Sequence, residues 1–294
     1  MRATRLSVIL VALACLAATA RAQEQDGAAL LNQQVILDQG IEVREEKPFK
    51  RWTVVPLYTF TAFNDGRAGW QQEYIEILYQ PLSNLILGTS IDIMQRPPSG
   101  TDILYSGLAS WYPVKYLELH SKLSFCPDPQ FAPNQIYSGG LEYQAAPRLL
   151  LLFDYTQYNF SSVAPLGPGS IEQVKPGFSW WFNDDVFFTF RYAQGWAFND
   201  DNYNYYAGTM NFWNMPGGGR LTVGLAYGTD PDLDFGTGDT SLSNAWIGSL
   251  FYRQPITESF ALVAGLQYVY RLRENNAGQL YQQWAPTIGA VWTF

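Results

Sequence analysis

His120 is the only histidine in the chain, so it is the one side chain that could act as an ordinary general base near neutral pH. Enzymes that attack lipids with a serine nucleophile need such a base within hydrogen-bonding distance of the serine. His120 stands between Glu118 and Lys122 in a run where polar residues alternate with apolar ones, and no HxSN-type motif surrounds it. The pattern favours a histidine satisfied by polar neighbours, and we predict that the protein is not an enzyme.

Residues that usually hold metal ions are also sparse. Cys126 is the only cysteine beyond the first 22 residues, and neither a CxxC nor an HExxH motif occurs. The acidic loop from Asp230 to Asp234 resembles the start of a calcium-binding loop, but its glycine comes one place late and Ser241 stands where a bidentate glutamate is needed. We therefore predict no metal site and no cofactor, with weak divalent binding by this loop as the alternative.

Composition argues against several classes of protein. The formal net charge is −8 and the sequence has no basic patch, so we predict no nucleic-acid partner. Hydrophobic residues make up 47% of the chain, yet no apolar run after the first 22 residues is long enough for a membrane helix. Only helices and closed barrels satisfy every backbone hydrogen bond in lipid, so a membrane form of this chain must be a barrel.

From Trp52 onward the sequence reads as a succession of strands. Segments of about ten residues alternate apolar and polar side chains, and clusters of Pro, Gly, Asn and Asp separate them. The spacing predicts an all-β fold, a transmembrane antiparallel up-and-down barrel of about 14 strands with a short periplasmic N-terminal tail. The predicted strands begin near Trp52, Gln72, Leu85, Asp102, Tyr116, Gln135, Leu149, Glu172, Val186, Tyr203, Arg220, Ser243, Phe260 and Tyr281.

Two kinds of connection alternate between these strands. Short ones follow aromatic strand ends and contain turn-forming residues, as in YQPLSN around Pro81 and WYPVKY around Pro113, which indicates periplasmic hairpins. The others, such as PDPQFAPN and SSVAPLGPGS, are polar and variable in length. We expect them to face outward from the cell.

Alternation also gives each strand a lipid face and a lumen face. Leu262 and Leu266 would face lipid, while Gln267 and Arg271 of the same strand would face the lumen. A Lys or Arg at mid-depth in lipid costs about 2–4 kcal/mol, so the register is strongly fixed. Eleven residues become candidates for lining the lumen, with five acids and five bases that leave little net field: Glu76, Asp92, Glu118, His120, Lys122, Glu142, Asp154, Lys175, Arg191, Arg253 and Arg271.

The N-terminal region predicts export. Arg2 and Arg5 precede a short apolar run, and the sequence Ala20-Arg21-Ala22 fits a small-x-small cleavage site, so residues 1–22 are predicted to be a signal peptide. Residues 23–51 are predicted to be a periplasmic tail, with a lumen plug or a docking segment as the alternatives. Residues 52–294 are the predicted outer-membrane barrel.

The last strand carries a second signal. Counting back in steps of two from Phe294 gives Trp292 and an unbroken apolar face as far as Trp284. This pattern resembles the C-terminal insertion signal of bacterial outer-membrane proteins, which the barrel-assembly machinery recognises.

The order of motifs between Ser138 and Phe294 resembles the YaiO-type outer-membrane barrels. The segments GGLEYQAAPRLLLLFDYTQYNF, KPGFSWWFNDDVFFTFRYAQGW, GRLTVGLAYGTDPD and FALVAGLQYVYRLRENN carry the resemblance. It implies an outer-membrane barrel linked in some bacteria to surface polysaccharide, and it offers no catalytic residue to carry over.

Three hypotheses for function follow. The first is a narrow porin or export channel for saccharide or surface polysaccharide, because a lumen of mixed charges, amides and hydroxyls suits a neutral, hydroxyl-rich solute. The second is a structural or docking protein with a plugged lumen, since about fourteen strands lies between filled and open barrels. The third is a lipid-modifying barrel enzyme. The expected location is the Gram-negative outer membrane, and the expected partners are outer-membrane lipid, lipopolysaccharide, the barrel-assembly machinery and polysaccharide synthesis or export proteins.

Overall fold

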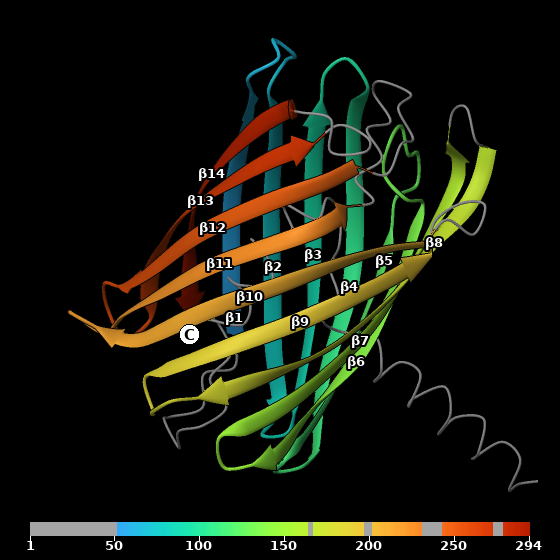
Figure 1. Ribbon diagram of the computed structural model, residues 1–294. Coiled ribbons are helices and arrows are strands. Elements are labelled where there is room, and N and C mark those ends of the chain that lie inside the picture. The colour runs from blue at the N-terminus through green and yellow to red at the C-terminus, as the bar shows by residue number, and fades with distance from the viewer. Residues whose placement is uncertain (1–51, 164–166, 197–201, 231–242, 273–278) are drawn as a thin grey trace, which may run out of the picture.

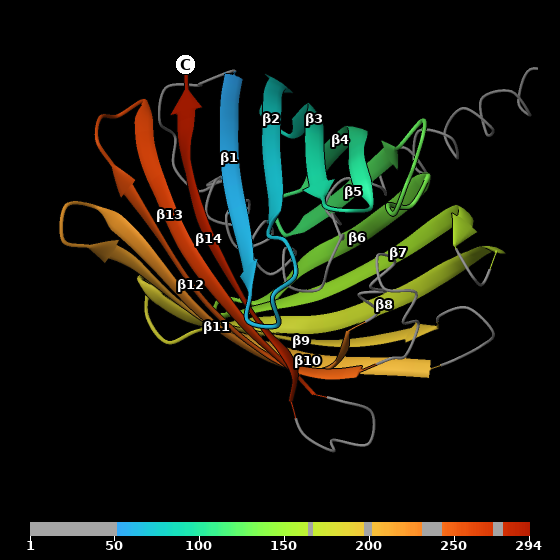
Figure 2. The same cartoon turned by 90° about the horizontal axis from the view of Figure 1, so that it is seen from above.

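The computed structural model describes residues 52–163, 167–196, 202–230, 243–272 and 279–294, which form one closed antiparallel barrel (Figure 1). Each strand pairs with its neighbours in sequence, and β1 closes on β14 (Figure 2). The predicted all-β barrel is confirmed, whereas the predicted signal peptide and tail lie outside the described residues. The fourteen strands are β1 (Trp52–Phe63), β2 (Trp70–Leu82), β3 (Leu85–Arg96), β4 (Gly100–Val114), β5 (Leu117–Phe125), β6 (Gln135–Ala146), β7 (Leu149–Val163), β8 (Gly167–Trp181), β9 (Val186–Trp196), β10 (Asn202–Met215), β11 (Gly219–Asp230), β12 (Ser243–Pro255), β13 (Phe260–Leu272) and β14 (Gln279–Thr293).

The two walls of the barrel follow from the alternation of side chains along each strand. On β13, Leu262 and Leu266 are 48% and 40% exposed, whereas Gln267 and Arg271 are 0% and 2% exposed. The same contrast recurs around the ring, so the exposed wall is apolar and the inner wall carries the polar side chains. An apolar wall of this extent requires lipid as its solvent, and the protein is an outer-membrane barrel. None of the described segments is a helix long and apolar enough to cross a bilayer.

Closure of the barrel rests on the pairing of its first and last strands. The Trp52 amide donates to the Phe294 carbonyl at 3.0 Å, and the Phe294 amide donates back to Trp52 at 2.9 Å. Higher on the same seam, the hydroxyls of Thr59 and Thr287 are hydrogen-bonded at 2.8 Å. The side chains of Trp292 and Phe294 point outward and are 57% and 60% exposed. The apolar face predicted for the last strand is therefore on the lipid side.

The connections between strands confirm the alternation seen in the sequence. Residues 83–84, 115–116, 147–148, 182–185, 216–218 and 256–259 form short turns at the end of the barrel that also holds Trp52 and Phe294. In outer-membrane barrels this end is periplasmic. One predicted loop is wrong in extent: β7 continues to Val163 and β8 begins at Gly167, within the segment read as SSVAPLGPGS. Glycine and proline near the first residue of a strand are compatible with pairing, which is why a composition rule misplaced this boundary.

Candidate functional site

The inner wall is the candidate site, and it holds all eleven residues that alternation assigned to the lumen. Eight of them are buried: Glu76, Asp92, Glu118, His120, Lys122, Asp154, Lys175 and Arg271. The other three, Glu142, Arg191 and Arg253, are partly buried and share the inward face of their strands with Ser138, Ala193 and Phe251. The structure sorts ten of these residues into two charge groups and a periplasmic rim. Arg271 lies apart from them at the extracellular end of β13, with its guanidinium 5.4 Å from the centroid of the Tyr281 ring.

The first charge group is centred on Asp154 of β7. His120 Nε2 lies 2.8 Å from Asp154 Oδ1, and Arg191 Nη1 donates to the second carboxylate oxygen. Glu118 lies on the other side of the imidazole, 4.0 Å from Nδ1, and Lys175 is directly opposite Asp154 on β8. His120 is thus bracketed by carboxylates, 1% exposed and turned away from lipid. This position does not suit a catalytic base for lipid chemistry.

Glycines make the first group possible. His120, Gly140 and Asp154 occupy one cross-strand row, and a Cβ on Gly140 would collide with the imidazole and the carboxylate. Gly177 acts in the same way beside Arg191, whose Cγ lies 3.0 Å from the Cβ position of Gly177. The side chains of His120 and Arg191 can therefore extend across β6 and β8 and reach Asp154 on β7.

The second charge group lies on β2, β3 and β5. The Tyr74 hydroxyl donates to Glu76 Oε2 at 2.6 Å, and Gln72 Nε2 donates to Asp92 at 2.9 Å. Lys122 Nζ lies 5.7 Å from the centroid of the Tyr74 ring, close enough to both carboxylates to interact with their charges. The second group thus combines two carboxylates, an ammonium group, an amide and a phenol on one side of the lumen.

Asp102 is a site residue that the sequence analysis missed. It lies at the extracellular start of β4, is 1% exposed, and accepts hydrogen bonds from the backbone amides of Gln130, Phe131 and Ala132 at 2.7, 2.9 and 2.6 Å. Alternation along β4 puts Asp102 on the inward face, so that signal was available. Nothing in the sequence indicated its partners, because they belong to the connection between β5 and β6.

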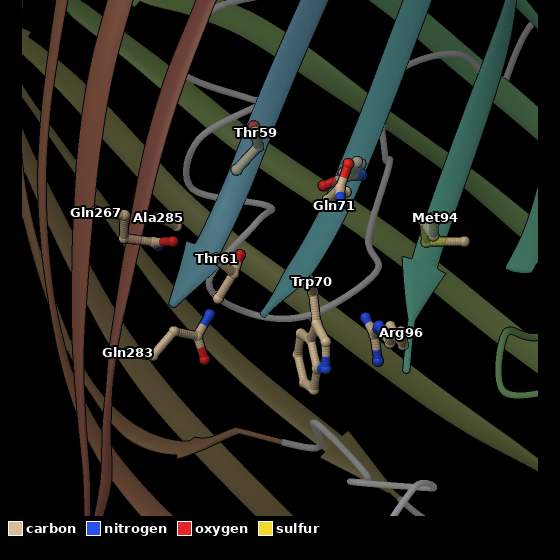
Figure 3. A pocket seen from close by; sticks show the side chains of 10 residues that line it. Thr59, Thr61, Trp70, Gln71, Met94, Arg96, Gln267, Gln283 and Ala285 are labelled. Atoms are coloured by element: carbon tan, nitrogen blue, oxygen red, sulfur yellow. The ribbon is translucent and has the colours of Figure 1, made fainter. Parts of the chain in front are cut away.

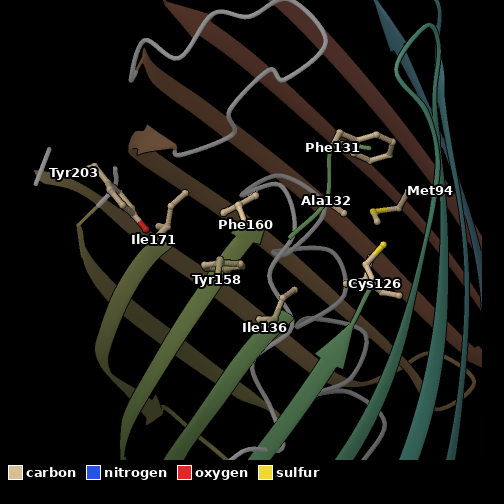
Figure 4. Packing of buried hydrophobic residues seen from close by; sticks show 10 residues of the cluster. Met94, Cys126, Phe131, Ala132, Ile136, Tyr158, Phe160, Ile171 and Tyr203 are labelled. Carbon is tan, nitrogen blue, oxygen red and sulfur yellow. The ribbon is translucent and has the colours of Figure 1, made fainter. Parts of the chain in front are cut away.

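That connection, residues 126–134, differs from the outward-facing polar loop that was predicted. It lies at the extracellular end, but it turns into the barrel, and Phe131 and Ala132 are only 5% and 6% exposed. Arg96 explains part of the inward turn, because its guanidinium lies 4.3 Å from the Trp70 ring and 4.7 Å from the Phe131 ring. The loop packs in an inward-facing apolar cluster that we call the extracellular cap (Figure 4), made of Met94, Leu104, Cys126, Phe131, Ala132, Ile136, Tyr158, Phe160, Ile171 and Tyr203.

Beside the cap, the extracellular end is polar. A small cavity there is lined by hydroxyls and amides from β1, β2, β13 and β14, by Arg96, and by the apolar side chains of Trp70, Met94 and Ala285 (Figure 3). Gln267 and Gln283 come from neighbouring strands on one side, and Thr59 and Thr61 from the strand across the seam. These groups donate and accept hydrogen bonds without adding charge.

A larger cavity opens at the periplasmic end, against β4 to β10, and we call it the vestibule. Its volume is about 1120 Å³. Glu118 and Glu142 line it and are directly opposite each other on β5 and β6. Three aromatic side chains, Trp181, Phe187 and Trp213, line it from β8, β9 and β10. The sequence analysis used the aromatic strand ends only to place periplasmic hairpins, and it did not single out these three residues.

Two arginines lie beyond Trp213, on the next two strands of the barrel. Arg220 of β11 and Arg253 of β12 are directly opposite each other, and the Arg220 guanidinium lies 5.0 Å from the Trp213 ring. The periplasmic mouth therefore carries acids on β5 and β6, aromatic rings on β8 to β10 and arginines on β11 and β12.

Solved structures with this fold are outer-membrane barrels. The chain is similar to the CymD monoaromatic hydrocarbon channel, with a TM-score of 0.55 and 11% identity over 84% of this chain and 89% of that one. It is similar to a Pseudomonas aeruginosa FadL homologue, with a TM-score of 0.54 and 10% identity over 83% and 90% of the two chains. A bacterial polysaccharide outer membrane secretin has a TM-score of 0.59 and 9% identity, over 84% of this chain and 100% of that one. No protein-family model and no curated protein matches the sequence, so the YaiO-type resemblance stays a prediction. In fold, the chain is similar to outer-membrane channels.

Proposed function

We propose that this protein is a narrow outer-membrane channel for a saccharide. One observation carries the proposal: the inward faces of the strands carry charged, amide and hydroxyl side chains from the periplasmic vestibule to the small cavity at the extracellular end. Such a wall offers hydrogen bonds to every part of a hydroxyl-rich solute. The apolar cap and the loop that joins it would close the remaining part of the extracellular end.

The balance of charge supports a neutral solute over an ion. Acids and bases are nearly equal in number on the inward faces of the described strands, so the net field along the pore is small. The acids are Glu76, Asp92, Asp102, Glu118, Glu142 and Asp154, and the bases are Arg96, Lys122, Lys175, Arg191, Arg220, Arg253 and Arg271.

Two likenesses support the saccharide part of the proposal. The structure with the TM-score of 0.59 is a polysaccharide secretin, and the YaiO-type resemblance implies a link to surface polysaccharide. The other two neighbours are a hydrocarbon channel and a FadL homologue, so the choice of solute rests mainly on the chemistry of the wall. Polysaccharide synthesis or export proteins would then be partners on the periplasmic side.

Planar-bilayer recording tests the proposal directly. We expect the refolded chain 23–294 to give discrete openings of uniform size, with little preference between K⁺ and Cl⁻. A neutral oligosaccharide added on the vestibule side should block these openings. Silence of both 23–294 and 52–294 under all voltages would contradict a channel.

One observation favours a second candidate, a structural or docking barrel with a closed lumen. The side chains at the centre of the inner wall are nearly inaccessible, with Glu76 2% exposed and Thr156 0% exposed. A closed barrel would show no openings in the same recording, yet it would still fold into lipid and meet lipopolysaccharide in the outer leaflet. The measurement thus separates the two candidates.

A further inference from the structure

The vestibule contains aromatic rings that membrane anchoring does not explain. Aromatic girdles face lipid at the barrel rims. Trp180 fits that role, since it is 44% exposed on the outer wall, but its neighbour Trp181 lines the vestibule. Phe187 and Trp213 line the same cavity from the next two strands.

These three rings form a continuous row, which we call the aromatic ladder. The rings of Trp181 and Phe187 are stacked, with centroids 4.9 Å apart and planes inclined by 20°. Phe187 meets Trp213 edge to face, with centroids 5.1 Å apart and an angle of 81°. The contacts between the rings hold them in place relative to one another. All three side chains are partly exposed, so part of each ring surface is open to the cavity.

Charged groups lie on the strands to either side of the ladder. Glu118 and Glu142 lie on β5 and β6, on one side of it, and the Arg220 guanidinium lies over Trp213 on the other. A ligand resting on the rings would therefore find hydrogen-bond acceptors at one edge and donors at the other.

We propose that the aromatic ladder is a binding subsite for pyranose rings of a saccharide. The inference rests on the proposed function and adds the place where the solute is held. One face of a pyranose is covered by C–H groups with slight positive charge, which suits the negative face of an aromatic ring. Its hydroxyls lie around the edge, where the glutamates accept hydrogen bonds and the arginine donates them. A neutral sugar and an amino sugar share this chemistry.

Calorimetric titration of the refolded chain 23–294 in detergent tests the subsite. The probes are cellohexaose as the neutral sugar and fully deacetylated chitohexaose as the amino sugar. We expect at least one of the two oligosaccharides to bind. The one that binds more tightly shows whether the subsite prefers a neutral sugar or an amino sugar. Lack of heat from both would overturn the proposal.

Matched variants then locate the binding. W181L and F187L should each weaken the affinity roughly five- to tenfold, as the loss of one ring contact predicts. W180L removes a tryptophan from the same strand end on the lipid wall and should leave the affinity unchanged. A heat-modifiable gel shift confirms that each variant is folded. Equal affinities in all three variants, or an equal loss in W180L, would refute the ladder as the subsite.

Conductance keeps this test separate from the proposed function. If added sugar blocks the openings of the parent and of W181L equally, the ladder is refuted and the channel stands. Sugar binding that W181L weakens, in a barrel that never opens, would refute the channel and leave the ladder intact.

Discussion

At the scale of single residues, the first charge group depends on glycines that leave room for its charged side chains to meet across a strand. The contact between His120 and Asp154 crosses an intervening strand at Gly140, where even one methyl group would occupy the space of both side chains. A buried ionic group that loses its partner costs free energy. Gly140 is therefore needed for the space that it leaves between His120 and Asp154, more than for its backbone freedom.

We expect Gly140→Ala to destabilise the barrel by about 1–3 kcal/mol, because the added Cβ would collide with the His120 and Asp154 side chains and with the backbone carbonyl oxygen of Phe153. Urea unfolding in lipid vesicles measures the change. Gly107→Ala is the matched control, since a Cβ there meets nothing within 4 Å, and it should stay within about 0.5 kcal/mol of the parent. Equal stability of the two variants would show that the His120 contact is dispensable.

At the scale of elements, the loop of residues 126–134 is fixed by one carboxylate. Three consecutive backbone amides converge on Asp102, and Phe131 packs against Arg96. Hydrogen bonds to a charged acceptor contribute about 1.5–3 kcal/mol each, which is ample to hold a short loop inside the barrel mouth. Cys126 lies at the base of this loop, where burial raises the pKa of its thiol and the charge of Asp102 raises it further.

Asp102→Asn should release this loop. The amide accepts fewer of the three hydrogen bonds, so local opening becomes more frequent and Cys126 is exposed more often. Removal of the negative charge also lowers the thiol pKa, which increases the thiolate fraction at neutral pH. We expect alkylation of Cys126 to accelerate about tenfold or more, the factor for losing one such hydrogen bond.

Asp65→Asn is the control for this measurement. Asp65 pairs with Arg67 at 2.7 Å in an exposed loop at the same end of the barrel. Exposed pairs of this kind contribute little, so alkylation should proceed at the parental rate. An unchanged rate in Asp102→Asn would mean that other contacts hold the loop.

The elements also show where sequence reasoning succeeds and where it ends. The number of strands and the wall that each side chain faces follow from the alternation of side chains along a strand. The free-energy cost of a charged side chain in lipid keeps this alternation in register. The position of His120 on the inner wall follows from that alternation, but its partner Asp154 lies two strands away and depends on register. The inward position of Trp181 follows from the same alternation, because Trp181 shares a face of β8 with Lys175. The loop contacts of Asp102 arise from tertiary packing, for which no local pattern exists.

At the scale of the whole molecule, the barrel closes through backbone atoms while the terminal side chain projects outward. The reciprocal hydrogen bonds between Trp52 and Phe294 use only main-chain groups. The Phe294 ring is 60% exposed and contacts Trp292 with centroids 5.9 Å apart. We propose that the barrel-assembly machinery recognises the Phe294 ring, a role that can be separated experimentally from the stability of the seam.

We expect Phe294→Ala to fold in detergent like the parent, with a change in unfolding free energy below about 1 kcal/mol, since the seam hydrogen bonds persist. In cells the amount of assembled barrel should fall several-fold, because the variant lacks the exposed ring that we propose is recognised. Phe182→Ala is the matched control, as Phe182 is 52% exposed in a turn at the same end, and it should assemble normally. Heat-modifiability of the outer-membrane fraction reports assembly, and refolding from urea reports stability. A Phe294→Ala chain that fails equally in both assays would assign the residue to closure of the barrel, not to recognition.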